Sequence, residues 1–270
     1  MPNIIIEMFK YDFVSRAFFA GLILSLGSAL IGTSLVLRKQ SMISDGLSHV
    51  SFGAAAIATI LGFTPIEFSI PVVIIAAILI LRLNQNSKIG GDAAIAVISA
   101  SALALGTFSI SISPGMNIDL NSYLFGSILA ITNHDLWLCV ILGIIIIFTF
   151  ALLHRQIFAI AFDEDFAKAI GIKVNVFNLI LATLCSLIIV VGMRMLGALL
   201  ISSLIIFPCL SSLQLSKTFR QNIILSASIS ILCFVTGFII SYSLNTPTSS
   251  TIVLANLLAL ILCWLYNKFR

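Results

Sequence analysis

The stretch VSRAFFAGLILSLGSALIGTSLVLRKQSMISDGLSHVSFGAAAIATIL, residues 14–61, decides the fold class. It contains two long apolar runs separated by a short polar stretch that includes Arg38 and Lys39. A helix that crosses a bilayer needs about 20 predominantly apolar residues, and each run supplies roughly this length. The stretch therefore predicts two consecutive transmembrane helices joined by a short turn.

The same pattern continues along the chain. Its 270 residues are 60% hydrophobic and only 9% charged, whereas a soluble domain carries about 25% charged residues. We expect an all-α polytopic membrane protein with one transmembrane domain over residues 1–270, about nine spans and a short N-terminal segment, residues 1–13. The predicted spans are Val14–Leu37, Met42–Leu61, Pro65–Leu81, Asp92–Ile112, His134–Leu153, Val176–Val191, Met195–Leu215, Asn222–Leu244 and Thr248–Tyr266.

Tyr123–Ile131 is apolar but too short to span, and we interpret it as a short extracytoplasmic re-entrant helix. With this segmentation and the Arg38–Lys39 turn in the cytoplasm, 11 of the 14 basic residues lie inside and 3 outside. Basic residues prefer cytoplasmic loops, so the N-terminus is predicted outside and the C-terminus in the cytoplasm. Counting Tyr123–Ile131 as a full span would invert every later loop and destroy this bias.

Asp45 and His49 lie within the second apolar run. Ionisable side chains at membrane depth are costly, and they usually mark an ion or proton path. Positions four apart share one helix face, so Ser41, Asp45, His49 and Gly53 form one stripe. Carboxylate with imidazole is a ligand set for a divalent transition metal. The alternative is a hydrogen bond that joins two helices.

Several classes of chemistry lack their motifs in this chain. It has no GxxxxGK[ST] phosphate loop, no HExxH and no GxSxG, so no enzyme is expected. The five cysteines fall in apolar runs without a CxxC and are interpreted as small buried hydrophobes. The net charge of +4 reflects loop residues next to lipid, and no nucleic-acid partner is indicated.

One predicted cytoplasmic loop, residues 154–175, contains FDEDFAKAIG, residues 162–171. Its acidic start, helix-forming middle and glycine stop predict a short amphipathic helix outside the bilayer. Such a helix either docks to a partner or merely reverses the chain.

These elements together resemble the permease subunits of zinc, manganese and iron ABC importers. RKQSMISDGLSHV (38–50) resembles the second-helix signature of that family, and YLFGSIL (123–129) resembles its outer segment. FDEDFAKAIG resembles its coupling-helix loop, GALLISSLIIFP (197–208) its small-residue helix that ends in proline, and PTSSTIVL (247–254) the start of its last helix. Gly46 and Val50 stand where alanines are common in the family.

The resemblance implies a type II ABC importer permease in a bacterial plasma (inner) membrane, with a second permease copy, a cytoplasmic ATPase under each and an extracytoplasmic metal-binding protein. The cargo would be Mn, Zn or Fe as a divalent ion, with no permanently bound cofactor. Asp45 and His49 match the family's metal-contacting pair. The coupling residues implied for the ATPase are Asp163, Glu164, Asp165, Phe166, Ala167 and Gly171.

Other polar and small residues are candidates for lining the path. Serine in a helix more often bonds to its own backbone, and glycine more often permits close packing. The lining candidates are Ser41, Ser48, Gly53, Ser202 and Ser203.

Three other functions are alternatives. A chelate importer, of siderophore or cobalamin type, would share the fold but need a wider aromatic and polar path. A proton-coupled carrier would need more intramembrane acids, often in inverted repeats. A membrane enzyme would need a nucleophile set.

Overall fold

The computed structural model describes residue 8 and residues 10–86, 91–113, 125–126 and 131–269. Within these residues the chain forms helices and no strand. The nine long helices are α2 (Asp12–Leu37), α3 (Met42–Ile60), α4 (Pro65–Asn86), α5 (Gly91–Ser111), α7 (Asn133–Phe162), α9 (Val174–Leu196), α10 (Ala198–Leu215), α11 (Phe219–Leu244) and α12 (Thr248–Phe269). A short helix, α8 (Glu164–Ala169), follows α7.

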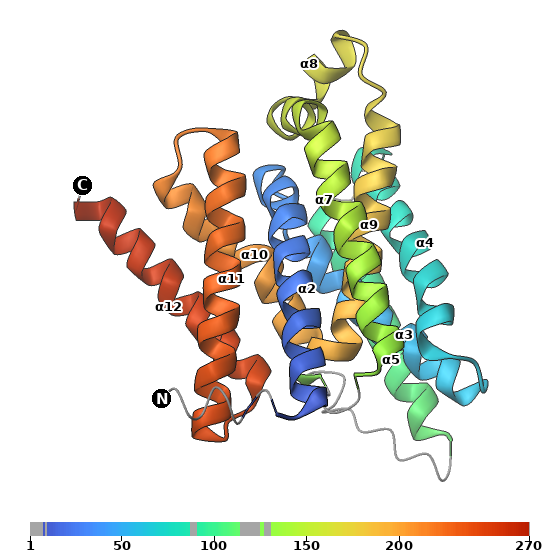
Figure 1. Cartoon of the computed structure of the whole chain (residues 1–270). Coiled ribbons are helices and arrows are strands. Elements are labelled where there is room, and N and C mark those ends of the chain that lie inside the picture. Colours follow the sequence, from blue (N-terminus) through green and yellow to red (C-terminus); the bar gives the residue numbers. More distant parts are fainter. Residues whose placement is uncertain (1–7, 9, 87–90, 114–124, 127–130, 270) are drawn as a thin grey trace.

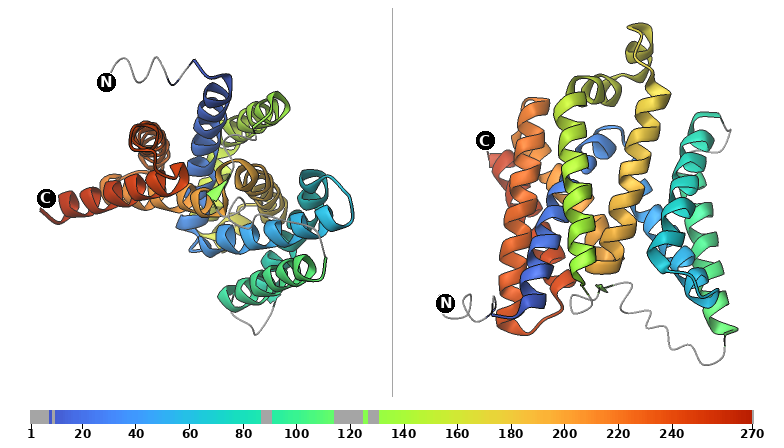
Figure 2. Two further views of the ribbon diagram at one scale, coloured as in Figure 1. Left: turned by 90° about the horizontal axis from the view of Figure 1, so that it is seen from below. Right: turned by 45° about the vertical axis from the view of Figure 1, so that its right-hand side comes forward.

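The long helices form one bundle around α2. Helices α3, α4 and α5 pack together on one side, and α10, α11 and α12 pack together on the other (Figures 1 and 2). Helix α9 contacts α3 and α4 as well as α2 and α10, and so joins the two groups. Helix α2 contacts α7, α9, α10 and α11. Helix α2 begins at the lower end of the bundle in Figure 1, whereas α8 lies at the upper end.

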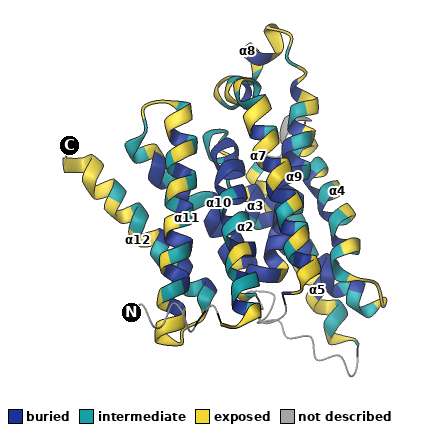
Figure 3. Cartoon of the chain, viewed as in Figure 1, coloured by how far each residue is buried: buried dark blue, intermediate teal, exposed yellow. Residues whose placement is uncertain are grey.

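Burial follows this arrangement. In α2, 72% of the spanning window is buried inside the single chain, against 17% in α5 and in α12 (Figure 3). The main hydrophobic cluster comes mostly from α2, α3, α4, α7, α9, α10 and α11, and α5 and α12 contribute one buried residue each, Ile95 and Ile252. Because the outer helices keep their apolar faces exposed, those faces are suited to lipid or to another subunit.

Eight of the long helices in the described part of the chain are apolar enough to cross a membrane. Helix α3 has 19 residues but is not among the eight, because it carries Asp45, His49 and several serines. Its length of about 28 Å still matches a hydrocarbon core of about 30 Å. The predicted all-α membrane architecture is confirmed, and the least apolar long helix is the one with the ionisable pair.

Three predicted helix ends were wrong. Helix α4 does not stop at Leu81 but continues to Asn86. Helix α7 does not stop at Leu153 but continues to Phe162, because no glycine or proline interrupts it before the Asp163 cap. The first part of the predicted 154–175 loop is therefore helix. The break after α9 lies at Gly197, which has φ +89°, and not between Val191 and Met195.

Most of the predicted re-entrant helix Tyr123–Ile131, and most of residues 1–13, lie outside the described residues. The surrounding topology is described, however. Helix α5 ends and α7 begins at the same lower end of the bundle (Figure 1). The alternation of the described helices on either side of this segment is therefore the one that the predicted segmentation assumes.

Candidate functional site

The site begins at the turn between α2 and α3. Arg38 caps α2, and Lys39 adopts a left-handed conformation with φ 57°. The Gln40 N–H donates to the Leu35 carbonyl over 2.9 Å, which closes the turn. Helix α3 then starts at Met42, so Asp45 lies in its first turn. Asp45 and His49 are about 5 and 10 Å along the helix axis from that start.

Asp45 and His49 lie side by side on one face of α3. His49 Nε2 is 3.8 Å from Asp45 Oδ2, a distance that permits an ionic contact but exceeds an ordinary hydrogen bond. The side chains are 33% exposed for His49 and 51% for Asp45 in the single chain. Neither side chain has a hydrogen bond to another helix among the described residues. The hypothesis that the pair joins two helices therefore has no support in these contacts.

The stripe that starts at Ser41 turns away from this open face. Each four-residue step advances a helix by about 40°, because 3.6 residues make one turn. At Gly53 the helix faces α5, where an added Cβ would lie 2.4 Å from the Ala102 carbonyl oxygen. Gly53 is thus a point of close contact between helices, which is the packing role that its size indicates.

The candidate serines differ in their bonding. The Ser48 hydroxyl donates to the Asp45 carbonyl oxygen over 2.7 Å, and that of Ser203 donates to the Leu200 carbonyl oxygen over 2.8 Å. Both bonds lie within the residue's own helix. The Ser202 hydroxyl is buried and has no hydrogen-bond partner among the described residues. Ser41 is partly exposed at the start of α3.

Helix α8 has the predicted amphipathic form. The Asp163 carboxylate caps it by accepting from the N–H groups of Asp165 (3.0 Å) and Phe166 (2.9 Å). Ala167 is fully buried and belongs to a small cluster with Ile160 and Val174. Phe166 is 58% exposed. The short helix is therefore anchored by its alanine and presents an aromatic side chain outward.

The end of α8 depends on a glycine. Gly171 has φ +86°, a conformation that side-chain-bearing residues seldom adopt. An added Cβ there would meet no atom within 4 Å. Backbone conformation, and not space, explains the glycine.

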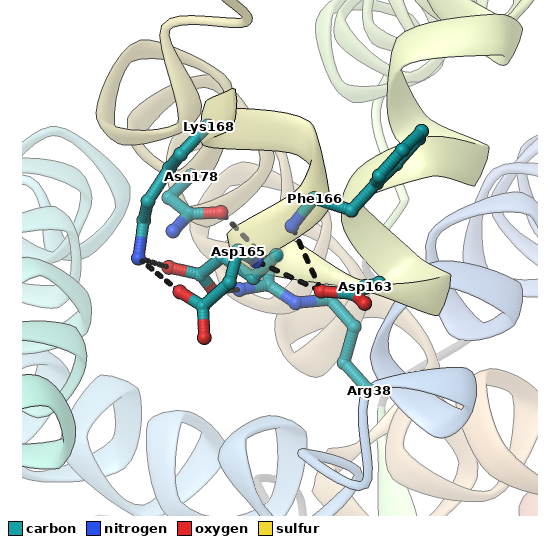
Figure 4. A network of polar contacts seen from close by, with 7 residues as sticks. Arg38, Asp163, Asp165, Phe166, Lys168 and Asn178 are labelled. Atoms are coloured by element: carbon teal, nitrogen blue, oxygen red, sulfur yellow. Dashed lines mark hydrogen bonds and ion pairs between the residues drawn. The ribbon is translucent and has the colours of Figure 1, made fainter. Parts of the chain in front are cut away.

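Arg38 connects α8 to the turn before α3 (Figure 4). Its guanidinium donates to Glu164 Oε2 over 3.2 Å and to Asn178 Oδ1 of α9 over 2.8 Å. Its side chain is only 8% exposed. Burial lowers the pKa of Arg38, and Glu164 opposes that shift by favouring the charged form. The same residue therefore joins three elements, which are α8, α9 and the turn that leads into α3.

Lys168 extends this network on the solvent side. Its ammonium lies 3.2 Å from Glu164 Oε1 and 3.2 Å from Asp165 Oδ1. These hydrogen bonds raise the pKa of Lys168. Glu164 thus lies between two cations, one buried and one exposed.

An ion pair at the opposite end of the bundle was not predicted. Arg194 Nη1 lies 3.3 Å from Asp135 Oδ1, and the Asp135 side chain is 4% exposed. Asp135 also forms a capping box with Thr132 at the start of α7. The Thr-x-x-Asp spacing could have indicated the cap. The pairing with Arg194 could not be found, because Arg194 was expected in a loop and lies in the last turn of α9.

The relatives of the chain agree with this architecture. The model of the ABC 3 transport family matches residues 10–267. The chain belongs to the ABC 3 transport family. It is 31% identical to the manganese import system permease protein ScaB of Streptococcus gordonii, over 92% of this chain and 89% of that protein. It is 35% identical to an uncharacterized membrane protein of Cyanophora paradoxa, over 96% of this chain and 88% of that protein.

A solved structure has the same fold over nearly the whole length. PsaBC from Streptococcus pneumoniae in complex with Fab superposes with a TM-score of 0.86 and 29% identity, covering 97% of this chain and 95% of that chain. The predicted class, a permease subunit of a metal-importing ABC transporter, is confirmed at the level of the family. The roles of individual site residues stay predictions.

Proposed function

We propose that this protein forms the translocation pathway of an ATP-driven importer whose cargo is manganese. The support for this metal is the name of the relative ScaB, a manganese import system permease protein, together with the ligand types of α3. A carboxylate oxygen and an imidazole nitrogen suit Mn²⁺ and Fe²⁺ at least as well as Zn²⁺, and no thiolate accompanies them.

Asp45 and His49 are the proposed transient ligands of the ion. The observation that carries this assignment is their half-exposed position on a membrane helix, with no hydrogen bond to another helix among the residues that the structure describes. One chain offers only these two groups, and no cluster of three His, Cys, Asp or Glu exists among the described residues. A symmetric homodimer would bring two carboxylates and two imidazoles together. Such an incomplete, water-filled site suits passage, since an ion must also leave.

Of the other candidates, Ser202 is the strongest for lining the path, because its buried hydroxyl lacks a partner among the described residues. Ser41 is a second, since it precedes Asp45 on the partly exposed start of α3. The weaker candidates are Ser48, Ser203 and Gly53. The two serine hydroxyls donate to carbonyl oxygens of their own helices, and Gly53 packs against α5.

The proposed assembly follows from the two ends of the bundle. Helix α8 is the docking element for a cytoplasmic ATPase, with Asp163, Glu164, Asp165, Phe166, Ala167 and Gly171 forming or shaping it. The opposite end receives the ion from an extracytoplasmic metal-binding protein. This places the N-terminus outside and the C-terminus in the cytoplasm, with residues 1–270 as one permease domain.

The test is metal uptake in cells that lack this gene. We expect manganese uptake to fall and to recover when the wild-type gene is returned. Competition with zinc and iron then measures the preference among ions. Unchanged uptake of all three ions, with loss of a siderophore or cobalamin, would contradict the proposal and favour a chelate importer.

A further inference from the structure

A cleft between α2, α7 and α11 ends at two basic side chains. The cleft has a volume of about 330 Å³ and apolar walls that include Leu30, Phe150 and Ile224. His154 of α7 and Arg220 of α11 also line it. Both lie toward the end of the bundle that carries α8 (Figure 1). The cleft therefore leads from the apolar interior of a membrane to its boundary.

Hydrogen bonds orient Arg220 at this cleft. His154 Nδ1 lies 3.2 Å from the Ala151 carbonyl oxygen, and His154 Nε2 lies 3.4 Å from Arg220 Nη2. A neutral histidine with its proton on Nδ1 satisfies both contacts, because Nδ1 then donates to Ala151 and Nε2 accepts from Arg220. The remaining N–H donors of the guanidinium stay available to a ligand.

Arg220 has no acidic partner within the described chain. The ion pairs there involve Arg38, His49, Lys168 and Arg194 as the basic members. Arg220 also lies in the first turn of α11, where the helix dipole is positive and repels a cation. Exposed Lys217 lies just before that turn and adds positive charge. The site attracts an anion.

The apolar walls of the cleft indicate the chemistry of the rest of the ligand. Ile224 is 66% exposed and Ile147, a second wall residue, is 45% exposed, so both face the acyl chains around the bundle. An occupant must therefore combine an apolar body with an anionic head. We propose that this cleft binds an anionic phospholipid, with the lipid phosphate on Arg220 and an acyl chain along α7 and α11. Basic pockets between membrane helices bind anionic headgroups in this way.

The test measures lipid retained by the complete transporter. The purified complex is exchanged into mixed micelles with phosphatidylglycerol or phosphatidylcholine, and bound lipid is counted by native mass spectrometry. We expect retention of phosphatidylglycerol over phosphatidylcholine. Arg220→Gln should weaken that retention about fivefold, the effect of one basic residue near a membrane. Ile224→Trp should also reduce it, because the indole fills the cleft while the charge remains.

Arg155→Gln is the matched control, since Arg155 is an exposed neighbour of His154 that does not line the cleft. Equal loss in Arg155→Gln and Arg220→Gln would show general charge attraction and overturn the site. Equal retention of both lipids, or full retention in Ile224→Trp, would also overturn it. Displacement of the lipid by inorganic phosphate would show a simple anion site in place of a lipid site. These readouts do not depend on manganese transport.

Discussion

Asp45 and His49 occupy a position that a structural role does not explain. An ionisable residue costs about 2.5–3.5 kcal/mol on insertion at the centre of a membrane helix and less toward the helix ends, where Asp45 lies in the first turn of α3. A polar contact between membrane helices returns about 0.6 kcal/mol on average. Here the pair does not even form such a contact within the described chain. Its half-exposed side chains are available to an ion, to water or to a second copy.

Gly53 illustrates how a residue on the same stripe takes a different role. Gly53 follows His49 by four residues, and this spacing correctly predicts that the two residues lie on the same side of α3. It did not reveal the 2.4 Å approach to the Ala102 carbonyl, since this depends on where α5 crosses. The rotation of a straight helix by about 40° per four residues moves Gly53 out of the open face.

Gly53→Ala should therefore destabilise the protein by about 1–3 kcal/mol through overpacking against backbone. Gly27→Ala is the control, because its Cβ would first meet Ile188 Cδ1, the tip of a flexible side chain, at 2.8 Å. We expect a lower melting temperature in detergent for Gly53→Ala than for Gly27→Ala. Equal melting temperatures would argue against a rigid α3–α5 crossing.

At the scale of elements, Arg38 couples α8 to the turn that leads into α3. A guanidinium can donate to Glu164 and Asn178 together because its donors form a planar fork, and a lysine cannot replace both bonds. The sequence predicted the helical form of α8 from its acidic start and its glycine stop. The link to Arg38 could not be predicted, because residues 38 and 164 are far apart in the chain.

Arg38→Lys should reduce manganese transport more strongly than it reduces ATP hydrolysis, since movement of α8 would reach α3 less directly. The measurement is the ratio of ions transported to ATP hydrolysed in reconstituted vesicles. Lys39→Gln is the control, because Lys39 is exposed in the same turn. An unchanged ratio in Arg38→Lys would rule out this link.

Gly171→Val should weaken docking of the ATPase by distorting the end of α8. A left-handed conformation costs about 1–2 kcal/mol for a residue with a side chain. Gly171→Asn should retain docking better, because asparagine tolerates that conformation. Copurification of the ATPase measures the difference. Equal copurification for the valine and asparagine variants would show that the φ of +86° does not matter.

The helix ends show where element prediction fails. The apolar pattern located all nine long helices, because each buries or exposes a continuous apolar surface. It misplaced the ends of α4 and α7 and the α9–α10 break. Charged residues usually indicate loops, yet Arg155 lies within α7 and Arg194 within the last turn of α9, where Asp135 balances its charge.

At the scale of the whole molecule, each end of the bundle has an ion pair between helical elements. Arg38–Glu164 joins elements at one end, and Asp135–Arg194 joins elements at the other. The helices alternate between these ends in the order that the predicted distribution of basic residues requires. The end with the excess of basic residues is the one predicted to face the cytoplasm.

Cysteine labelling in intact cells tests this orientation. Thr64→Cys, before α4, should react with a membrane-impermeant thiol reagent, because it lies at the predicted outer end. Lys39→Cys should react only after the membrane is permeabilised. Wild type supplies the background, since its cysteines are buried or partly buried. The reverse labelling pattern would invert the proposed orientation.

The most direct test of the account is ATP-driven manganese uptake by vesicles that contain the permease and its ATPase and are supplied with the metal-binding protein. His49→Ala removes the proposed imidazole ligand, and Ser44→Ala removes a hydroxyl that only bonds to the Ser41 carbonyl of the same helix. We predict that His49→Ala assembles normally but that its uptake rate falls by more than about tenfold. Even the groups that hydrogen-bond to metal ligands change activity by about this factor when they are mutated. Ser44→Ala should retain uptake. Wild-type uptake by an assembled His49→Ala transporter would contradict the assignment of the Asp45/His49 pair to the metal path.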